Sequence, residues 1–172
     1  PWKPHIYQRR AAKWLVERGA AALFLDPGLG KTSVTFAALN ALRKAGQTRL
    51  ALVIAPLRVC REVWPNEAAK WREFAGTRVA VLHGKDRKKL LAAATNGEYD
   101  VCAINPEGLA WLVPRKRAAK GLGGDDGAPD PAAFAELGFD TLVVDEITKF
   151  KHARSGRSKL LRPLLPTFRR RW

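Results

Sequence analysis

The chain has 172 residues, 47% of them hydrophobic, which is enough for one well-cored domain but not for two ordinary ones. Its formal net charge of +15 favours a polyanionic partner over a merely soluble basic surface, because a positive field attracts phosphate backbones. Two isolated cysteines, three scattered histidines and the lack of an apolar run near ~20 residues argue against disulfides, a histidine metal site and a membrane span. We therefore expect a cytoplasmic or nucleoid-associated protein that is not secreted and has no membrane contact.

An amphipathic helix is predicted at the start of the chain. Residues 4–18 place Ile6 and Leu15 at roughly helical spacing, and Gly19 follows as a stop signal. Gln8 lies in the first turns of this helix, and its amide can both donate and accept, as the N6/N7 edge of adenine requires. A surface glutamine is the simpler alternative at this position.

The next stretch, AAALFLDPGLGKT at residues 20–32, predicts a strand, a phosphate-binding loop and the start of a helix. Gly28 and Gly30 lack the Cβ atoms that would keep backbone N–H groups from closing around an anion. In such a loop Lys31 reaches the outer phosphates of a nucleotide, and the Thr32 hydroxyl binds Mg²⁺. With the preceding glutamine, the expected nucleotide-binding residues are Gln8, Pro27, Gly28, Leu29, Gly30, Lys31 and Thr32.

This loop departs from the strict phosphate-loop pattern at one position. The pattern has a glycine five residues before Gly30, where this sequence has Leu25. A glycine turn that caps a helix in an unrelated α/β protein is therefore the alternative for the loop taken alone. A second motif later in the chain decides between the two interpretations.

Strand and helix patterns alternate through the rest of the chain. Apolar runs predict strands at residues 49–54, 78–82, 99–104 and 139–144. Helical patterns occupy residues 31–45, 59–74 with a break at Pro65, 85–95, and a segment that begins at Asn105, a natural N-cap before Pro106. This alternation favours an α/β fold with a mainly parallel sheet flanked by helices. Residues 114–138 are basic, then glycine-rich and acidic, and we expect a mobile surface insertion there.

The strand at residues 139–144 ends in Asp145 and Glu146, roughly 110 residues after the phosphate loop. Parallel strands present their carboxyl ends at one edge of the sheet, where ligands bind in open α/β folds. Asp145 can there hold Mg²⁺, directly or through water, and Glu146 can accept the proton of an attacking water. Alone, such a pair is usually the acidic start of a helix. After a Gly-Lys-Thr loop it indicates an ATPase in which Lys31, Asp145 and Glu146 are catalytic.

Together these motifs resemble the first RecA-like lobe of a superfamily 2 helicase or translocase of the Swi/Snf type. By resemblance, Tyr7 and Gln8 correspond to the adenine-reading glutamine motif and DPGLGKT to motif I. The sequence DEIT at residues 145–148 corresponds to motif II, and the basic run at 149–159 to its continuation. The resemblance implies ATP and Mg²⁺ as cofactors.

The resemblance also implies DNA as the partner, while the sequence leaves RNA open as the track. The segment APLR and the stretch DVCAINPEGL are similar to family segments that touch the nucleic-acid backbone, as is His83-Gly84. Pro56, Arg58 and Asn105 are the nucleic-acid-binding residues that this similarity implies.

The resemblance covers residues 1–172 as one incomplete lobe. The chain begins with Pro1, contains no methionine, and ends before the family's motif III, so we expect a fragment without the second RecA-like lobe and its arginine fingers. Such a fragment should bind ATP weakly and be nearly inactive. The alternatives are another P-loop NTPase, although a GTPase would need an Asn-Lys-x-Asp guanine reader, and a basic nucleic-acid-binding module with a non-hydrolysing nucleotide site.

Overall fold

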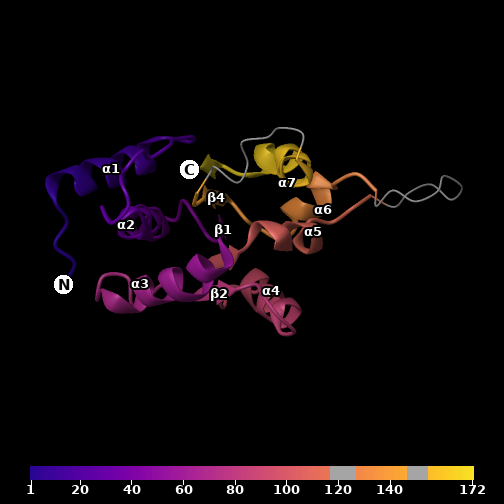
Figure 1. The fold of residues 1–172 in the computed structure, drawn as a ribbon, viewed down its shortest axis with the longest axis horizontal. Coiled ribbons are helices and arrows are strands. Elements are labelled where there is room, and N and C mark those ends of the chain that lie inside the picture. The colour runs from indigo at the N-terminus through magenta and orange to yellow at the C-terminus, as the bar shows by residue number, and fades with distance from the viewer. Residues whose placement is uncertain (117–126, 147–154) are drawn as a thin grey trace, which may run out of the picture.

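Five parallel strands form the sheet in the computed structural model, which describes residues 1–116, 127–146 and 155–172 (Figure 1). The strand order across the sheet is β2-β3-β1-β4-β5. The bounds are Ala51–Ile54 for β1, Val79–Val81 for β2, Val101–Ile104 for β3, Thr141–Val144 for β4 and Arg170–Arg171 for β5. The first four are the strands expected from apolar runs, and the predicted α/β fold with a parallel sheet is confirmed.

Helices cover both faces of this sheet. Their bounds are Ile6–Glu17 for α1, Lys31–Lys44 for α2, Trp64–Lys70 for α3, Arg87–Thr95 for α4, Leu109–Leu112 for α5, Pro131–Ala135 for α6 and Gly156–Leu161 for α7. Alternate residues of a strand point to opposite faces, and β1 divides its side chains accordingly. Leu52 and Ile54 share one core cluster with α5, α6 and α7, whereas Ala51 and Val53 share another with α2 and α3.

The central strand β1 fixes which loops meet at the carboxyl edge of the sheet. Ile54 is in register with Ile104 of β3 on one side and with Val144 of β4 on the other. The residues that follow these strands therefore emerge side by side. Asp145 is one of them, and its N–H donates to the carbonyl of Ile54 at 2.8 Å.

The prediction of a strand before the phosphate loop is wrong. Only Ala20 forms a bridge, with Arg171 of β5, and the rest of that stretch has no strand geometry. The neighbouring strand β5 has two residues, and no further bridge of this stretch is present within the described residues. Phe24 in this stretch is 93% exposed. Near the end of the sequence, Arg170 and Arg171 form strand β5 of the sheet.

The segment at residues 59–74, expected to be helical with a break at Pro65, is divided next to that residue. A π-helical turn at Val59–Val63 precedes α3, and Pro65 stands in the first turn of α3, where its missing N–H costs no helix bond. The helix ends at Lys70 because Trp71 adopts an extended conformation.

The helix expected to begin at Asn105 is a 3₁₀ turn, Pro106–Gly108, followed by α5. Asn105 stands at the N-cap position before Pro106, as expected, but its side chain makes no cap bond and instead donates from Nδ2 to Glu107 Oε2 at 2.7 Å.

The range 114–138, expected as a surface insertion, ends inside the core. Phe134 of α6 is fully buried and stacks on Phe139, with ring centroids 5.9 Å apart. Residues 117–126 lie outside the described part of the chain, so the mobile segment stays a prediction. No helix within the described ranges is long and apolar enough to cross a membrane.

Candidate functional site

The phosphate loop needs glycine at both expected positions. Gly28 and Gly30 have φ angles of 86° and 78°, in the left-handed region that side chains rarely adopt. Gly30 also directly precedes α2, and a Cβ on it would lie 2.6 Å from Nε2 of Gln8. The loop therefore brings the backbone N–H groups at the start of α2 to an open surface, with the positive end of the helix dipole behind them.

Lys31 joins the start of α2 to the entrance of the loop. Its Nζ donates to the carbonyl oxygens of Leu25 at 2.6 Å and Asp26 at 3.2 Å. An ammonium group carries three N–H donors. Two are used by these carbonyls within the described residues, so one is left for an anion on the loop.

Gln8 is 7% exposed, so it is not the surface glutamine that the sequence left as an alternative. Its Nε2 donates to the carbonyl of Leu29 at 3.1 Å, and its Oε1 accepts from the N–H of His5 at 2.9 Å. The Tyr7 hydroxyl donates to the same Leu29 carbonyl at 3.3 Å. These contacts tie α1 to the phosphate loop, and the adenine contact of Gln8 stays a prediction.

Asp145 lies across from the loop at the carboxyl edge, half-buried. Its Oδ2 accepts from the indole Nε1 of Trp64 at 3.3 Å. Burial raises the pKa of Asp145, and the charge of Glu146 adds to this effect, whereas the Trp64 hydrogen bond and the Lys31 cation oppose it. Burial without a bound cation thus makes the charged form of this carboxylate costly.

Glu146 has a φ of 75° and is the one residue other than glycine with positive φ in the described ranges. Such a backbone costs about 1–3 kcal/mol and persists where the surroundings require it. Glu146 lies two residues after β4, at the carboxyl edge of the sheet. Residues 147–154, which include Ile147 and Thr148 of the expected motif II and the first part of the basic run, lie outside the described residues.

Two hollows meet at Lys31, Thr32 and Asp145, which line both. The larger cavity, about 710 Å³, is bounded by the loop residues Pro27, Gly28 and Gly30, by Gln8, and by Trp71 after α3. This volume lies within the usual range for small-molecule and cofactor sites.

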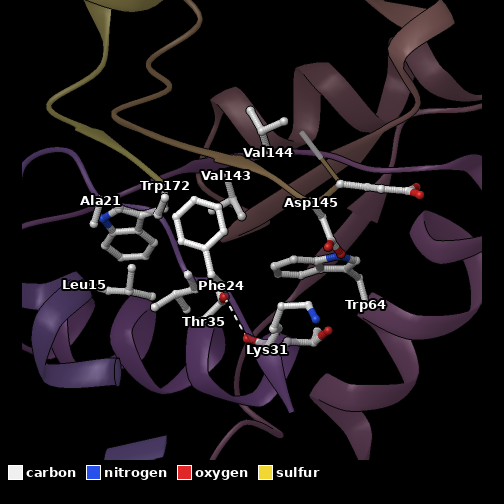
Figure 2. Close-up of a pocket in the computed structure, with 14 residues that line it drawn as sticks. Leu15, Ala21, Phe24, Lys31, Thr35, Trp64, Val143, Val144, Asp145 and Trp172 are labelled. Carbon is white, nitrogen blue, oxygen red and sulfur yellow. Dashed lines mark hydrogen bonds between the residues drawn. The ribbon is translucent and has the colours of Figure 1, made fainter. Parts of the chain in front are cut away.

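The smaller cavity, about 270 Å³, lies between Leu15, Phe24 and Trp172 on one side and Val143 on the other (Figure 2). Its lining is largely apolar. The polar groups that could contact phosphates are thus gathered at the larger cavity and at its junction with the smaller one.

The residues present fit a magnesium–nucleotide complex better than a metal held by protein alone. No group of three or more His, Cys, Asp or Glu side chains could hold a metal ion in the part of the chain that is described. Thr32 and Asp145 supply one hydroxyl and one carboxylate. Mg²⁺ is usually bound through one or two carboxylates with waters and substrate phosphates, which matches this small donor set.

The expected nucleic-acid residues also follow strands at the carboxyl edge. Pro56 comes after β1 and Asn105 after β3, and these two strands pair directly. Arg58 is exposed and its Nε pairs with Glu62 Oε2 at 2.9 Å. His83 follows β2 at the same edge.

Trp64 and Glu67 are site residues whose contacts the sequence did not reveal. Trp64 contacts Asp145, and Glu67 accepts a hydrogen bond from Ser33, the neighbour of Thr32. Their spacing of three residues on one helix is a signal that they share a face, but it does not tell what that face contacts.

Comparisons with known proteins give one family and a consistent fold. A model of the SNF2-related domain matches residues 7–172. Protein p41 of Acyrthosiphon pisum secondary endosymbiont phage 1 is 31% identical over 152 residues, which are 88% of this chain and 29% of that protein.

Two solved structures from Sulfolobus solfataricus are similar over 99% of this chain. The SWI2/SNF2 ATPase core in complex with dsDNA has a TM-score of 0.69 at 24% identity, and the SWI2/SNF2 ATPase core domain has 0.70 at 23%. The chain covers 31% and 30% of those two chains. It thus spans less than a third of the length of each of these three proteins.

Proposed function

This chain belongs to the SNF2-related domain family, and on that premise we propose that it is the ATP-binding lobe of a superfamily 2 DNA-dependent ATPase, a helicase or double-strand translocase. One observation carries the proposal. The phosphate loop and the Asp145 carboxylate, more than a hundred residues apart in sequence, line the same cavity at the carboxyl edge of the sheet. This is the edge at which open α/β folds bind nucleotides.

In the proposed site, the loop N–H groups and Lys31 hold the β- and γ-phosphates of ATP. Thr32 and Asp145 hold Mg²⁺, which when bound would neutralise charge that develops on the phosphates. Glu146 orients the attacking water and accepts its proton, a role for a carboxylate that does not bind the metal. Pro27, Gly28, Leu29 and Gly30 shape the loop, and Gln8, already beside Leu29, is within the lining that would meet adenine.

DNA is the proposed track. The net charge of +15 suits a phosphate backbone, and one of the similar Sulfolobus structures is a complex with dsDNA. Pro56, Arg58 and Asn105 would contact the backbone from loops beside the nucleotide cavity, and Arg58 would exchange its exposed partner Glu62 for a phosphate. Such a protein would work with nucleic acid in the cytoplasm or nucleoid, without membrane contact and together with a second RecA-like lobe.

The test of the nucleotide site is Lys31→Ala, measured by isothermal titration calorimetry with ATP and Mg²⁺. We expect the variant to lose detectable ATP binding, because its ammonium is the cation that the loop places against the outer phosphates. Lys44→Ala is the matched control, since Lys44 ends the same helix far from the loop. A folded Lys31→Ala protein with unchanged affinity would remove the phosphate-loop assignment.

A further inference from the structure

The helix α3 contacts both sides of the candidate nucleotide site. From its first residue, Trp64 donates to Asp145 on the β4 side. One turn later, Glu67 accepts from the hydroxyl of Ser33, which lies in the first turn of α2. Residues three apart on a helix lie on the same face, so one face of α3 joins the carboxylate to the phosphate-loop helix.

The Trp64 contact is held by close packing. Trp64 is 1% exposed, and its ring lies against that of Phe36 in α2, with centroids 5.0 Å apart. A buried indole N–H needs an acceptor, and this one uses Oδ2 of Asp145. The bond restricts rotation of the carboxylate, whose head lies beside the indole ring and faces the space above Lys31 (Figure 2).

The Glu67 contact fixes the other side. The same Oε1 that accepts from Ser33 also accepts from the indole Nε1 of Trp71 at 2.7 Å. Ser33 is 6% exposed and directly follows Thr32. The carboxylate lies at the N-terminal end of α2, where the helix dipole favours a negative charge. Glu67 therefore anchors the turn of α2 that carries the Thr32 hydroxyl.

We propose that Trp64 and Glu67 are positioning residues that set the spacing between Asp145 and Thr32 for a magnesium–nucleotide complex. This inference rests on the proposed function. Neither side chain needs to touch the metal, because each acts through a residue that does. Partners of metal ligands in other proteins typically change metal affinity by 10–100-fold when they are removed.

The experiment uses the full-length protein and measures binding, not turnover. ATP affinity is determined by calorimetry at rising Mg²⁺ concentrations and in EDTA, for the wild type, Trp64→Phe and Glu67→Gln. Trp64→Phe keeps an aromatic ring against Phe36 but removes the indole donor and part of the buried ring volume. We expect it to raise the half-saturating Mg²⁺ concentration about tenfold while leaving the affinity for ATP in EDTA unchanged. Glu67→Gln weakens the hydrogen bond from Ser33 and should raise the half-saturating Mg²⁺ concentration about threefold.

The control for an altered tryptophan is Trp14→Phe, because Trp14 is half-exposed on α1 and lines neither hollow. If Trp64 has a purely structural role, Trp64→Phe lowers the melting temperature and leaves the Mg²⁺ dependence of ATP binding as in the wild type. That result overturns the proposal. If Trp64→Phe does not fold, an unchanged Mg²⁺ dependence of the shape-conserving Glu67→Gln overturns it equally. Failure of the wild type to bind ATP with Mg²⁺ would instead refute the proposed function.

Discussion

At the scale of one residue, burial of the charged Asp145 carboxylate lowers the free energy of unfolding. The carboxylate is half-buried beside Trp64, and its pKa is raised chiefly by burial. A raised pKa means that the folded state binds the proton more tightly than the unfolded state does. The stabilising contribution of protonated Asp145 is therefore complete below the ordinary pKa of aspartate and is lost as the pH rises through the raised value.

Asp145→Asn should consequently increase the free energy of unfolding at neutral pH in the absence of divalent cations. Asparagine keeps the shape and an oxygen acceptor for the Trp64 indole, and it carries no charge to desolvate. The gain should shrink as the pH falls below the usual aspartate range, where the wild-type carboxyl is also neutral. Urea unfolding in EDTA at several pH values measures this gain in the free energy of unfolding. A gain that stays constant with pH would contradict burial of the charged carboxylate as its cause.

Glu146→Gln separates nucleotide binding from hydrolysis. In the full-length protein we expect ATP affinity within about twofold of the wild type, because the change spares Lys31 and Asp145 and keeps the side-chain shape. Hydrolysis should fall by about 10²–10⁴-fold, the usual contribution of a general base. Single-turnover assays with radiolabelled ATP measure both quantities. Normal turnover would assign the base to another residue, whereas a wild type that never hydrolyses ATP would favour a binding module.

At the scale of the element, the central strands were predictable and the edges were not. Residues in β1 and β3 are buried on both faces, so their sequence is apolar throughout and indicates a covered parallel strand. The stretch before the phosphate loop is equally apolar, but within the described residues it pairs with the sheet through a single bridge, between Ala20 and Arg171. Its neighbour in the sheet is β5, whose two residues are arginines, so no apolar run marked them as a strand.

The side-chain cap expected at Asn105 is absent for a similar reason. Asparagine is a common N-cap residue, but the Asn105 amide is hydrogen-bonded to Glu107, two residues later. Phe134 lies in the range expected to be an insertion. The glycine-rich and acidic residues before it gave no indication that it belongs to the core. Local preferences were outweighed by contacts that only the folded chain brings together.

The element contacts at Asp100 yield a stability prediction. Asp100 is 6% exposed and joins α2 to the strands, since it accepts from Arg43 Nη2 at 2.9 Å and from Arg78 Nη2 at 3.0 Å. Asp100→Asn should lower the free energy of unfolding by about 2–3 kcal/mol, because it leaves two cations without their buried partner.

Glu62→Gln is the matched control for that measurement. It breaks the pair with Arg58, in which both side chains are largely exposed, and should cost much less than Asp100→Asn because solvent screens the pair. Both values come from chemical denaturation at one pH and ionic strength. Equal costs for the two variants would mean that Asp100 does not hold the elements together.

At the scale of the molecule, the sequence predicted residues that line one cavity of the structure, but not the residues that support them. Gly28, Gly30, Lys31 and Asp145 could be named because each chemical role requires a particular residue type at a particular spacing. The contacts of Trp64 and Glu67 could not, because packing beside a site can be achieved by many residue types. The structure adds that one helix, α3, spans both sides of the cavity.

The 172-residue chain by itself should bind ATP weakly and hydrolyse it negligibly, with or without DNA. An arginine that reaches the transferred phosphoryl group from a neighbouring element is worth roughly 10³–10⁵ in rate. Arg170 is bound to Gln47 and Arg171 to the carbonyl of Leu165, and β5 places both beside the amino end of β4, away from Asp145. Neither of these two arginines therefore lies where it could reach a phosphate bound at the loop.

The measurement is a steady-state ATPase assay of the purified chain with and without duplex DNA, followed by addition or fusion of the remaining part of the protein. The Lys31→Ala chain gives the background rate from contaminating ATPases. We expect turnover to appear only when the proposed second RecA-like lobe is added, because such a lobe would share the adenine, ribose and γ-phosphate contacts. DNA-stimulated turnover on the order of 1 s⁻¹ from the chain alone, the low end for phosphoryl-transfer kinases, would show that this lobe carries a complete catalytic site.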